Sequence, residues 1–347
     1  MRIEAIKFLH PKTEMSNDDV VQVIREHSHD VFQGDLERAL EAIKFMLDGT
    51  GLKKRYWMKE ETPLELMRQA GEAAIADAGV DKSDIDLLIF CGIGRGFLEP
   101  GDSYFVAQAL GLETVDCFDV MDACMAWSRA CDVVESFFRS GRYKRAMIVN
   151  AESYFNAGGI AFPSNFILKD FRSIEYSFGA YCGGDGATAT ILVADDEHAW
   201  DRNYISTKRA ADLCTIPLHG YENRSQPSPY IGHNGLGAFT AYGSRVFTEA
   251  QPHMISVLKM LEPHFADVKM IFAHTGGDVN SYERWAEAAG AGGKIRYLYP
   301  EFGNLGSASI PASIAHHVEK GDIKRGDKIG AWIGSSGMSF TSYALVY

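Results

Sequence analysis

Apolar residues follow two alternating patterns along this chain, short continuous runs and longer stretches at helical spacing. The segment from Ile85 to Cys91 is a nearly continuous apolar run, which is typical of a strand buried on both faces of a parallel sheet. Before it, residues 63–79 have helical spacing, and the motif Thr62–Glu65 supplies a Thr cap, Pro at the first helical position and a Glu that can bond back to the cap. Helices and strands that alternate in this way predict an α/β protein with mainly parallel sheets.

The second half of the chain repeats the order of elements predicted for the first half. The corresponding segments are helices 63–79 and 244–261, strands 85–91 and 268–273, the helix-and-strand segments 102–120 and 280–299, helices 124–140 and 308–319, and strands 146–150 and 328–333. Self-similarity at a separation of roughly 180 residues indicates two copies of one unit. We therefore predict an N-terminal half at residues 1–195, with a cap insertion in the aromatic-rich segment 152–182, and a C-terminal half at residues 196–347.

Composition narrows the function without identifying it. The chain has 347 residues, of which 46% are hydrophobic and 23% are charged, as in an ordinary globular protein. A formal net charge of −12 without any run of Lys or Arg argues against a nucleic-acid partner. No apolar run approaches the roughly 20 residues of a membrane helix, so we expect no membrane association. The N-terminus lacks the core of a signal peptide, so we expect a cytoplasmic protein.

The cysteine pattern also fits that setting. The six cysteines contain no C-x-x-C pair, which suits a reducing compartment and no zinc knuckle. Cys117, Cys124 and Cys131 are evenly spaced, which could suggest a metal site. Because their segment crosses a predicted strand-to-helix junction, the three sulfurs need not converge. We therefore expect neither a bound metal nor a cofactor.

Cys124 lies at that junction and is the first candidate for chemistry. Residues 113–118 favour a strand, and residues 125–138 carry apolar side chains at helical spacing without Pro or Gly. The free N–H groups and the positive end of the helix dipole would face the sulfur and favour the thiolate, which is a nucleophile. The alternative is a small apolar residue at a tight turn, because free Cys is among the most buried residue types.

His274 and Asn304 also follow predicted strands, at points that the repeat relates to Cys124. Asn304 occupies the junction that matches Cys124, and His274 ends the strand that matches 85–91. Strand ends of open α/β sheets are where sites gather. A His can exchange a proton or donate a hydrogen bond to an anionic oxygen, and an Asn amide can share that oxygen. Taken singly, His274 could be structural and Asn304 a turn residue, but three such residues at related points favour a site.

With these residues the chain resembles the thiolase superfamily, and within it the β-ketoacyl-acyl-carrier-protein synthase III branch. The resemblance extends over about residues 45–347. It rests on motifs that occur in the family's order, namely Asp122-Ala123-Cys124, Gly184-Asp185-Gly186-Ala187, His274, and Gly303-Asn304 through Ser307-Ala308-Ser309-Ile310-Pro311. The opening Thr50–Arg55 and the closing Gly334–Ser339 also match, but they are weak alone.

The resemblance implies a thiolase-like, five-layered α-β-α-β-α fold of two pseudo-repeated halves that works as a homodimer. It implies that an acyl thioester of coenzyme A or of acyl-carrier protein acylates Cys124. The oxyanion hole would combine the N–H of Cys124 with that of a Gly in the closing loop, which we take as Gly337. His274 and Asn304 would hold the thioester oxygen of a malonyl thioester during a decarboxylative Claisen condensation, in fatty acid or polyketide biosynthesis.

Some residues depart from the family pattern. His274 is followed by Thr275-Gly276-Gly277, where the family usually has Gln-Ala-Asn, and the segment 22–48 is longer than expected. Phe45 stands where the family has the Trp that stacks on the adenine of coenzyme A. We predict that Phe45 and Arg55 are substrate-binding residues.

Glu99, which precedes Pro100, is a departure that could change the reaction. Synthase III enzymes usually carry a Phe here that reaches toward the partner subunit's pocket. An acid at this point is similar to the head-to-head condensing enzymes of long-chain olefin and ketone biosynthesis, in which it is thought to act as the base of a condensation without decarboxylation. The alternative is an exposed loop Glu, given the Gly, Pro and Asp around it.

Three other functions fit parts of the pattern. Acyl transfer to an amine or alcohol is known among relatives of this branch, but the presence of both His274 and Asn304 speaks against it. A catalytically idle partner in a heterodimer would not need the intact Cys-His-Asn set. A Cys protease or hydrolase could use those three residue types, but it would need neither the repeat nor the Gly-Asp-Gly-Ala segment. The sequence therefore predicts a condensing acyltransferase.

Overall fold

Two five-stranded sheets with the same strand order form the framework of the molecule. The computed structural model describes residues 1–156 and 158–347. The first sheet has the order β1 (Arg2–Leu9), β7 (Gly186–Val193), β6 (Arg145–Glu152), β4 (Leu87–Cys91) and β5 (Asp116–Val120). The second has the order β8 (Asp201–Ser206), β14 (Ser339–Val346), β13 (Lys328–Ser335), β11 (Ile271–Ala273) and β12 (Ile295–Tyr297).

The pairing of the strands is repeated as well. In the first sheet β4 is parallel to β5 and β6, whereas β7 runs antiparallel to both β6 and β1. In the second sheet β11 is parallel to β12 and β13, whereas β14 runs antiparallel to both β13 and β8. The predicted repeat is therefore present strand for strand. All strands of the first sheet lie before residue 195 and all strands of the second lie after it.

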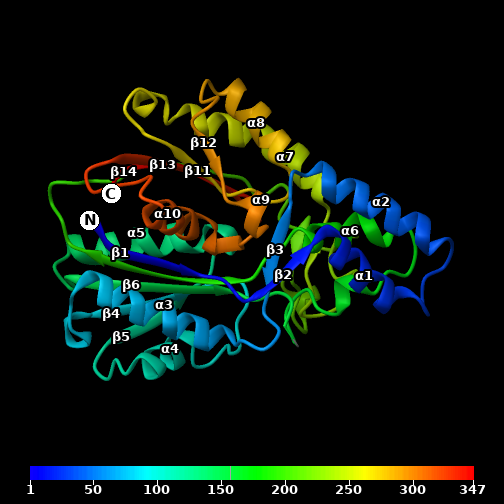
Figure 1. The fold of residues 1–347 in the computed structure, drawn as a ribbon, viewed down its shortest axis with the longest axis horizontal. Helices are drawn as coiled ribbons and strands as arrows, with labels where there is room; N and C mark the ends of the chain where they lie inside the picture. Colours follow the sequence, from blue (N-terminus) through cyan, green and yellow to red (C-terminus); the bar gives the residue numbers. More distant parts are fainter. Residues whose placement is uncertain (157) are drawn as a thin grey trace.

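Helices complete a five-layered α-β-α-β-α stack, as predicted (Figure 1). The outer helices are α3 (Pro63–Ala78) and α4 (Asp102–Leu110) on the first sheet, and α7 (Gly243–Lys259) and α8 (Val279–Ala288) on the second. The middle layer consists of α5 (Ala126–Arg139) and α10 (Ser309–Glu319). Buried side chains of both central helices, such as Trp127, Ala130, Ile310 and Ile314, join one hydrophobic core with both sheets. Helix α10 is buried over its first seven residues and carries no Lys, Arg or Asp, whereas α5 is amphipathic and keeps charged residues such as Arg129 and Asp132 on its outer face.

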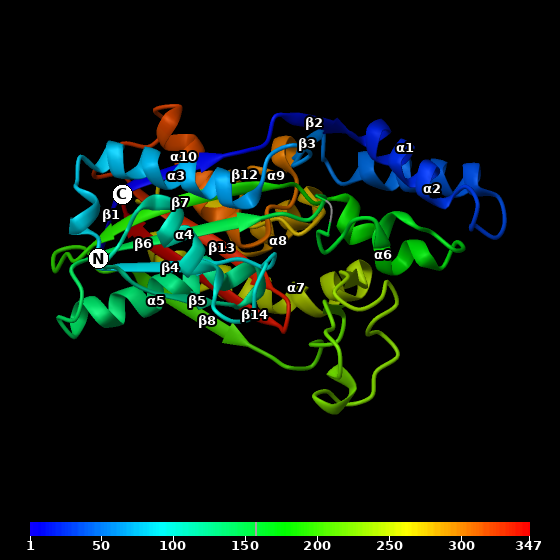
Figure 2. The same ribbon diagram turned by 90° about the horizontal axis from the view of Figure 1, so that it is seen from below.

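An N-terminal excursion lies to one side of this stack. It contains a small sheet of β2 (Thr13–Ser16) and β3 (Lys54–Trp57) and the two helices α1 (Asn17–Ser28) and α2 (Leu36–Gly49). Both helices pack with α6 (Ser173–Tyr181), which lies in the predicted cap segment, as Figures 1 and 2 show. The sequence analysis missed α1, although Ser16 and Asp19 form a capping box at its start.

The remaining elements are short. They are β9 (Cys214–Thr215), β10 (Thr240–Ala241), α9 (Tyr299–Phe302), and 3-10 turns at Lys82–Asp84, Ala123–Met125, Ser164–Phe166, Tyr221–Asn223, Glu262–His264 and Gly306–Ala308. The two chain ends lie side by side, away from α1 and α2 (Figure 1). Among the described residues, none of the helices is both long enough and apolar enough to cross a membrane.

Candidate active site

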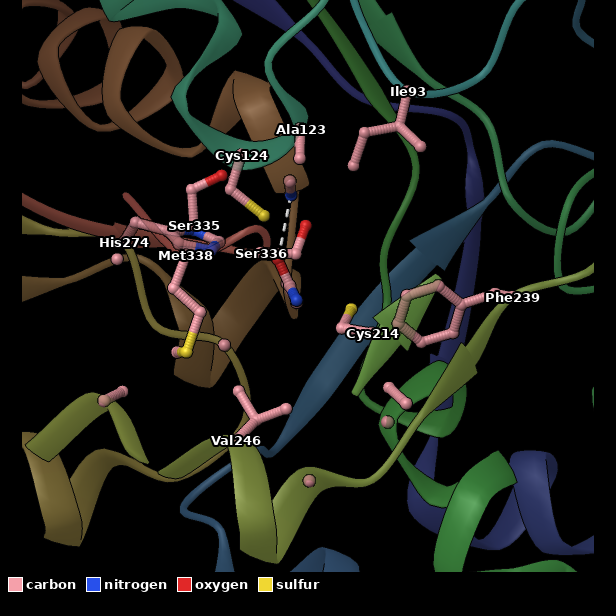
Figure 3. Close-up of a pocket in the computed structure, with 18 of the residues that line it drawn as sticks. Ile93, Ala123, Cys124, Cys214, Phe239, Val246, His274, Ser335, Ser336 and Met338 are labelled. Atoms are coloured by element: carbon pink, nitrogen blue, oxygen red, sulfur yellow. Dashed lines mark hydrogen bonds between the residues drawn. The ribbon is translucent and has the colours of Figure 1, made fainter. Parts of the chain in front are cut away.

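A cavity of about 270 Å³ lies where the two halves meet, and Cys124, His274 and Asn304 all line it. The three residues that the sequence singled out are therefore brought together. Figure 3 shows the sulfur of Cys124 pointing into this space, with His274, Ser335 and Met338 beside it and Cys214 and Phe239 across from it. Most of the remaining wall is apolar, and it includes Ile93, Met121, Ile160, Ala161, Val246, Phe247, Met254, Trp285 and Phe340.

A strained turn presents Cys124 to the cavity. The turn Ala123–Met125 connects β5 to α5, as expected for a strand-to-helix junction. Ala123 has φ 47°, a backbone conformation that residues other than Gly rarely adopt and that often marks functional turns. The hydroxyl of Ser335, at the end of β13, donates to the carbonyl of Asp122 at 3.2 Å. The C-terminal half therefore helps to hold the turn that carries the nucleophile.

The electrostatic expectation for Cys124 needs a correction. Burial raises the pKa of the Cys124 thiol well above its usual range, and the neighbouring Cys214 and Glu152 add to the effect. The backbone N–H of Cys124 itself opposes this shift by lowering the pKa of the thiol. Burial thus favours the thiol form of Cys124, whose proton must leave when the sulfur attacks.

His274 is a neutral residue held at the end of β11. Its backbone N–H donates to the carbonyl of Trp332 at 3.0 Å, and its Nδ1 lies 2.9 Å from the hydroxyl oxygen of Ser309. Only 2% of its surface is exposed, and burial lowers the pKa of His274 to about 4. The imidazole is therefore uncharged near pH 7, so it can offer one N–H donor and one acceptor.

The amide of Asn304 has one orientation. Its Oδ1 accepts a hydrogen bond from the backbone N–H of Gly306 at 2.8 Å, which only an oxygen can do. Its own backbone bonds to Cys182 and Gly184 at 2.8 and 3.0 Å and fixes the chain at this point. Among the described residues none accepts a hydrogen bond from Nδ2, which can therefore donate into the cavity that Asn304 lines. His274 and Asn304 together supply neutral donors close to the nucleophile.

The sequence prediction missed Glu152, a fully buried acid at the carboxyl end of β6. Burial raises the pKa of Glu152 to about 7, against the opposing effect of hydrogen bonds from Ser307, Tyr154 and Ile93. Tyr154 and Ser336, which also line the cavity, were missed as well. The position of Glu152 directly after an apolar run, at a strand end, was the available signal.

The other predicted site residues lie outside the cavity wall. Gly337 is not among the lining residues, whereas its neighbours Ser336 and Met338 are. Phe45 is 81% exposed on α2, and Glu99 is exposed in the loop between β4 and α4.

Arg55 has a different environment from the one predicted. It is fully buried, and its guanidinium donates to Asn17 Oδ1 at 2.8 Å and to the carbonyls of Tyr181 and Met15 at 3.1 and 3.4 Å. These acceptors, all from the protein, engage Nη1 and Nη2 of the guanidinium. Arg55 therefore ties the N-terminal excursion to α6.

Comparison with known proteins gives sequence relatives that carry the name of one enzyme family. The profile of 3-oxoacyl-[acyl-carrier-protein (ACP)] synthase III matches residues 118–209, and the profile of its C-terminal part matches residues 264–347. The β-ketoacyl-[acyl-carrier-protein] synthase III of Aliarcobacter butzleri is 30% identical over 313 residues, which cover 85% of this chain and 87% of the relative. The enzyme of the same name from Clostridium perfringens is 26% identical over 288 residues, which cover 81% and 83%.

Solved structures share the fold at lower identity. OleA of Xanthomonas campestris, solved with bound lauric acid and lauroyl-CoA, superposes with a TM-score of 0.80 at 17% identity, covering 99% of this chain and 98% of that one. The 3-oxoacyl-[acyl-carrier-protein] synthase III of Aquifex aeolicus superposes with a TM-score of 0.76 at 20% identity, covering 100% and 99%. The thiolase-like fold expected from the sequence is thus confirmed.

Proposed function

The chain belongs to the β-ketoacyl-[acyl-carrier-protein] synthase III family, and on this basis we propose that it joins an acyl group carried on Cys124 to a malonyl thioester. It is an acyltransferase that forms carbon–carbon bonds by Claisen condensation, as its relatives' names indicate. We assign these roles because the thiol of Cys124, the neutral His274 and the oriented amide of Asn304 line one largely apolar cavity.

In the first half-reaction the sulfur of Cys124 attacks the carbonyl carbon of an acyl thioester. A new carbon–sulfur bond forms, the bond to the carrier's sulfur breaks, and the proton of Cys124 passes to the departing thiol. The backbone N–H of Cys124 and one from the loop after β13 would stabilise the oxyanion. The proposed second donor is the N–H of Gly337, whose neighbours Ser336 and Met338 both line the cavity.

In the second half-reaction a malonyl thioester loses carbon dioxide, and the electron pair of the broken bond forms an enolate. The Nε2–H of His274 and the Nδ2–H of Asn304 would donate to the enolate oxygen. The enolate carbon then attacks the acyl carbonyl, and as the new carbon–carbon bond forms the carbon–sulfur bond to Cys124 breaks. The sulfur leaves as a thiolate and takes up a proton from water. Neutral donors aimed at developing charge in a dry pocket stabilise such a transition state strongly.

The test separates the two half-reactions. Intact-mass analysis should detect an acyl group on Cys124 after incubation with an acyl-CoA or acyl-carrier-protein thioester, and product should form when a malonyl thioester follows. In His274→Ala and Asn304→Ala, acylation should stay within about tenfold, whereas condensation should lose on the order of 2–4 kcal/mol of transition-state stabilisation. Collapse of acylation with unaffected condensation of pre-acylated protein would contradict these roles.

The proposal includes a homodimer. Strand β5 lies at an edge of the first sheet, and the surface beside it exposes apolar side chains: Leu98 is 77%, Met121 68%, Tyr104 53% and Phe97 46% exposed. Met121 also lines the cavity, so a second copy that covered this surface would close the cavity from outside. The six free cysteines support a reducing cytoplasmic setting.

The same surface supports a second candidate reaction. Glu99 lies next to the exposed Leu98, on the loop that a partner subunit would cover. In a dimer its carboxylate would approach the partner's cavity, where it could remove a proton from a plain acyl thioester. That reaction would join two acyl thioesters without decarboxylation.

A further inference from the structure

Glu152 is a fully buried carboxylate that the proposed chemistry does not use. It ends β6 and sits between two loops of the cavity. Its Oε1 accepts the backbone N–H of Ser307 at 2.9 Å and also the hydroxyl of the same residue. Its Oε2 accepts the backbone N–H of Ile93 at 3.3 Å, and the hydroxyl of Tyr154 completes the set.

The hydrogen bonds of Glu152 connect it to Asn304 through one turn of the chain. Ser307 belongs to the turn Gly306–Ala308, and the N–H of Gly306 fixes the Asn304 amide. Gly306 is itself packed against the carboxylate: a Cβ there would collide with the Tyr154 hydroxyl and come within 2.9 Å of Glu152 Oε1. The position of the donor to Asn304 therefore depends on where Glu152 holds the turn.

The donors around Glu152 require a carboxylate and not merely a polar group of that size. Two of them are backbone N–H groups, one on each carboxylate oxygen, and a backbone N–H cannot reverse its polarity. A glutamine could accept from only one of them, because its amide nitrogen has no free lone pair. The other N–H would face a second donor in a buried site, which is costly.

From this arrangement we propose that Glu152 is a positioning residue for the condensation step, acting through the turn Gly306–Ala308 on the Nδ2–H of Asn304. The inference rests on the proposed function, because it assumes that Asn304 serves the second half-reaction. The contact with Ile93 extends the role, since that residue begins the loop that carries Glu99. One carboxylate thereby sets the Asn304 turn and the β4–α4 loop relative to each other.

The experiment compares Glu152→Gln with wild type in each half-reaction. Acylation of the nucleophile by an acyl-CoA should stay within about threefold, whereas condensation of the pre-acylated protein with malonyl-CoA should fall by about 100-fold, as expected for a misplaced catalytic group. Glu152→Asp keeps both acceptor oxygens and should recover at least about tenfold of that loss. Hydrogen–deuterium exchange should show faster exchange at Gly306 and Ser307 in Glu152→Gln, a readout that does not depend on activity.

Asp185→Asn is the matched control. Asp185 is also a buried acid, and its carboxylate accepts two backbone N–H bonds, from Met58 at 2.8 Å and Tyr154 at 2.7 Å. Among the described residues, its carboxylate accepts no hydrogen bond from the turn Gly306–Ala308. It should reduce stability without changing the ratio of the two half-reactions. An equal change of that ratio in both variants, or unchanged condensation in Glu152→Gln, would overturn the proposal.

Two further results keep the test decisive. If Glu152→Gln does not fold, Ser307→Ala, which removes one donor to the carboxylate, should still slow condensation by about threefold with acylation unchanged. Equal rates in Ser307→Ala and wild type would then count against the proposal. Failure of the proposed function itself would be recognised separately, because wild-type protein would then fail to condense at all.

Discussion

The Nδ1 of His274 lies 2.9 Å from the hydroxyl of Ser309 at the start of α10. Both residues are buried, and the hydroxyl of Ser313 donates to the Ser309 carbonyl at 2.7 Å, which fixes this first turn of the helix. If the Ser309 hydroxyl donates to Nδ1, the single proton of the neutral imidazole resides on Nε2. Ser309 would thus select the tautomer that can donate into the cavity.

This relationship predicts that His274 stays neutral through the working range. Burial lowers the pKa of His274 to about 4, so its ¹⁵N resonances should show the Nε2–H tautomer, without titration, from about pH 5.5 to 8. Ser309→Ala should slow condensation by roughly tenfold, because the tautomer would no longer be fixed. A His274 imidazole that titrates near 6.5 in the wild-type protein would contradict the assignment.

The second prediction concerns the two thiols that face each other across the cavity. Burial raises the pKa of Cys214 to about 11 and raises that of Cys124 further. Alkylation of either thiol by iodoacetamide should therefore accelerate by about tenfold per pH unit between pH 7 and 9, because only the thiolate reacts. A plateau below pH 8 would show that Cys124 is already a thiolate.

Acyl thioesters should distinguish these thiols, and Cys214→Ser provides the control. Peptide mapping should place the acyl group on Cys124 in both wild type and Cys214→Ser, since only Cys124 lies on the strained turn at the start of α5. Label on Cys117, Cys131 or Cys214, or acylation that survives in Cys124→Ala, would contradict its role as nucleophile.

The order of helices and strands could be predicted from the sequence, because apolar residues recur along each element at the spacing of a helix or a strand. The apolar run at 85–91 and the helical spacing at 63–79 recur in the second half, so the alternation of helices and strands and the two related halves could be predicted from the pattern. The five-layered stack was implied by the resemblance to the thiolase superfamily. Helix α1 was missed, because its apolar residues Val20, Val21 and Ile24 are few and acids surround them. Its capping box was the clearer signal.

The candidate site could be predicted only in part from the sequence, because the burial of a side chain and the direction in which it points leave no periodic pattern. Strand ends located Cys124, His274 and Asn304, but the charge state of Cys124 depends on how much water reaches it. Which residues of the closing loop face the cavity, here Ser336 and Met338, depends on how the chain turns at single residues. Likewise, the burial of Arg55 follows from contacts with α6, which lies far away in the sequence.

The third prediction tests the homodimer. Leu98→Asp or Met121→Asp would place a charge in an apolar contact, which should weaken dimerisation by at least about tenfold, because a carboxylate buried without a partner is costly. Sedimentation velocity should show wild type at twice the chain mass and a shift toward monomer in both variants. Met260→Asp, at an exposed position after α7, is the control and should leave the mass unchanged. A monomeric wild type would contradict the prediction.

The last prediction decides which condensation Glu99 serves. The loop from Gly92 to Gly101 lies between β4 and α4, and its Leu98 is 77% exposed, so the loop is placed to enter a partner's cavity in a dimer. A base is needed only when the second thioester has no carboxyl group to lose, because decarboxylation itself generates the carbanion.

Glu99→Gln should therefore be assayed with a malonyl thioester and, separately, with a plain acyl thioester. Glu113→Gln, another exposed acid outside this loop, is the matched control. If the decarboxylative reaction is the main one, Glu99→Gln should keep malonyl-dependent activity within about threefold, and any activity with the plain donor should fall by about 100-fold. Equal losses with both donors would assign Glu99 to the interface and not to proton transfer, whereas no loss with either donor would leave it a surface residue.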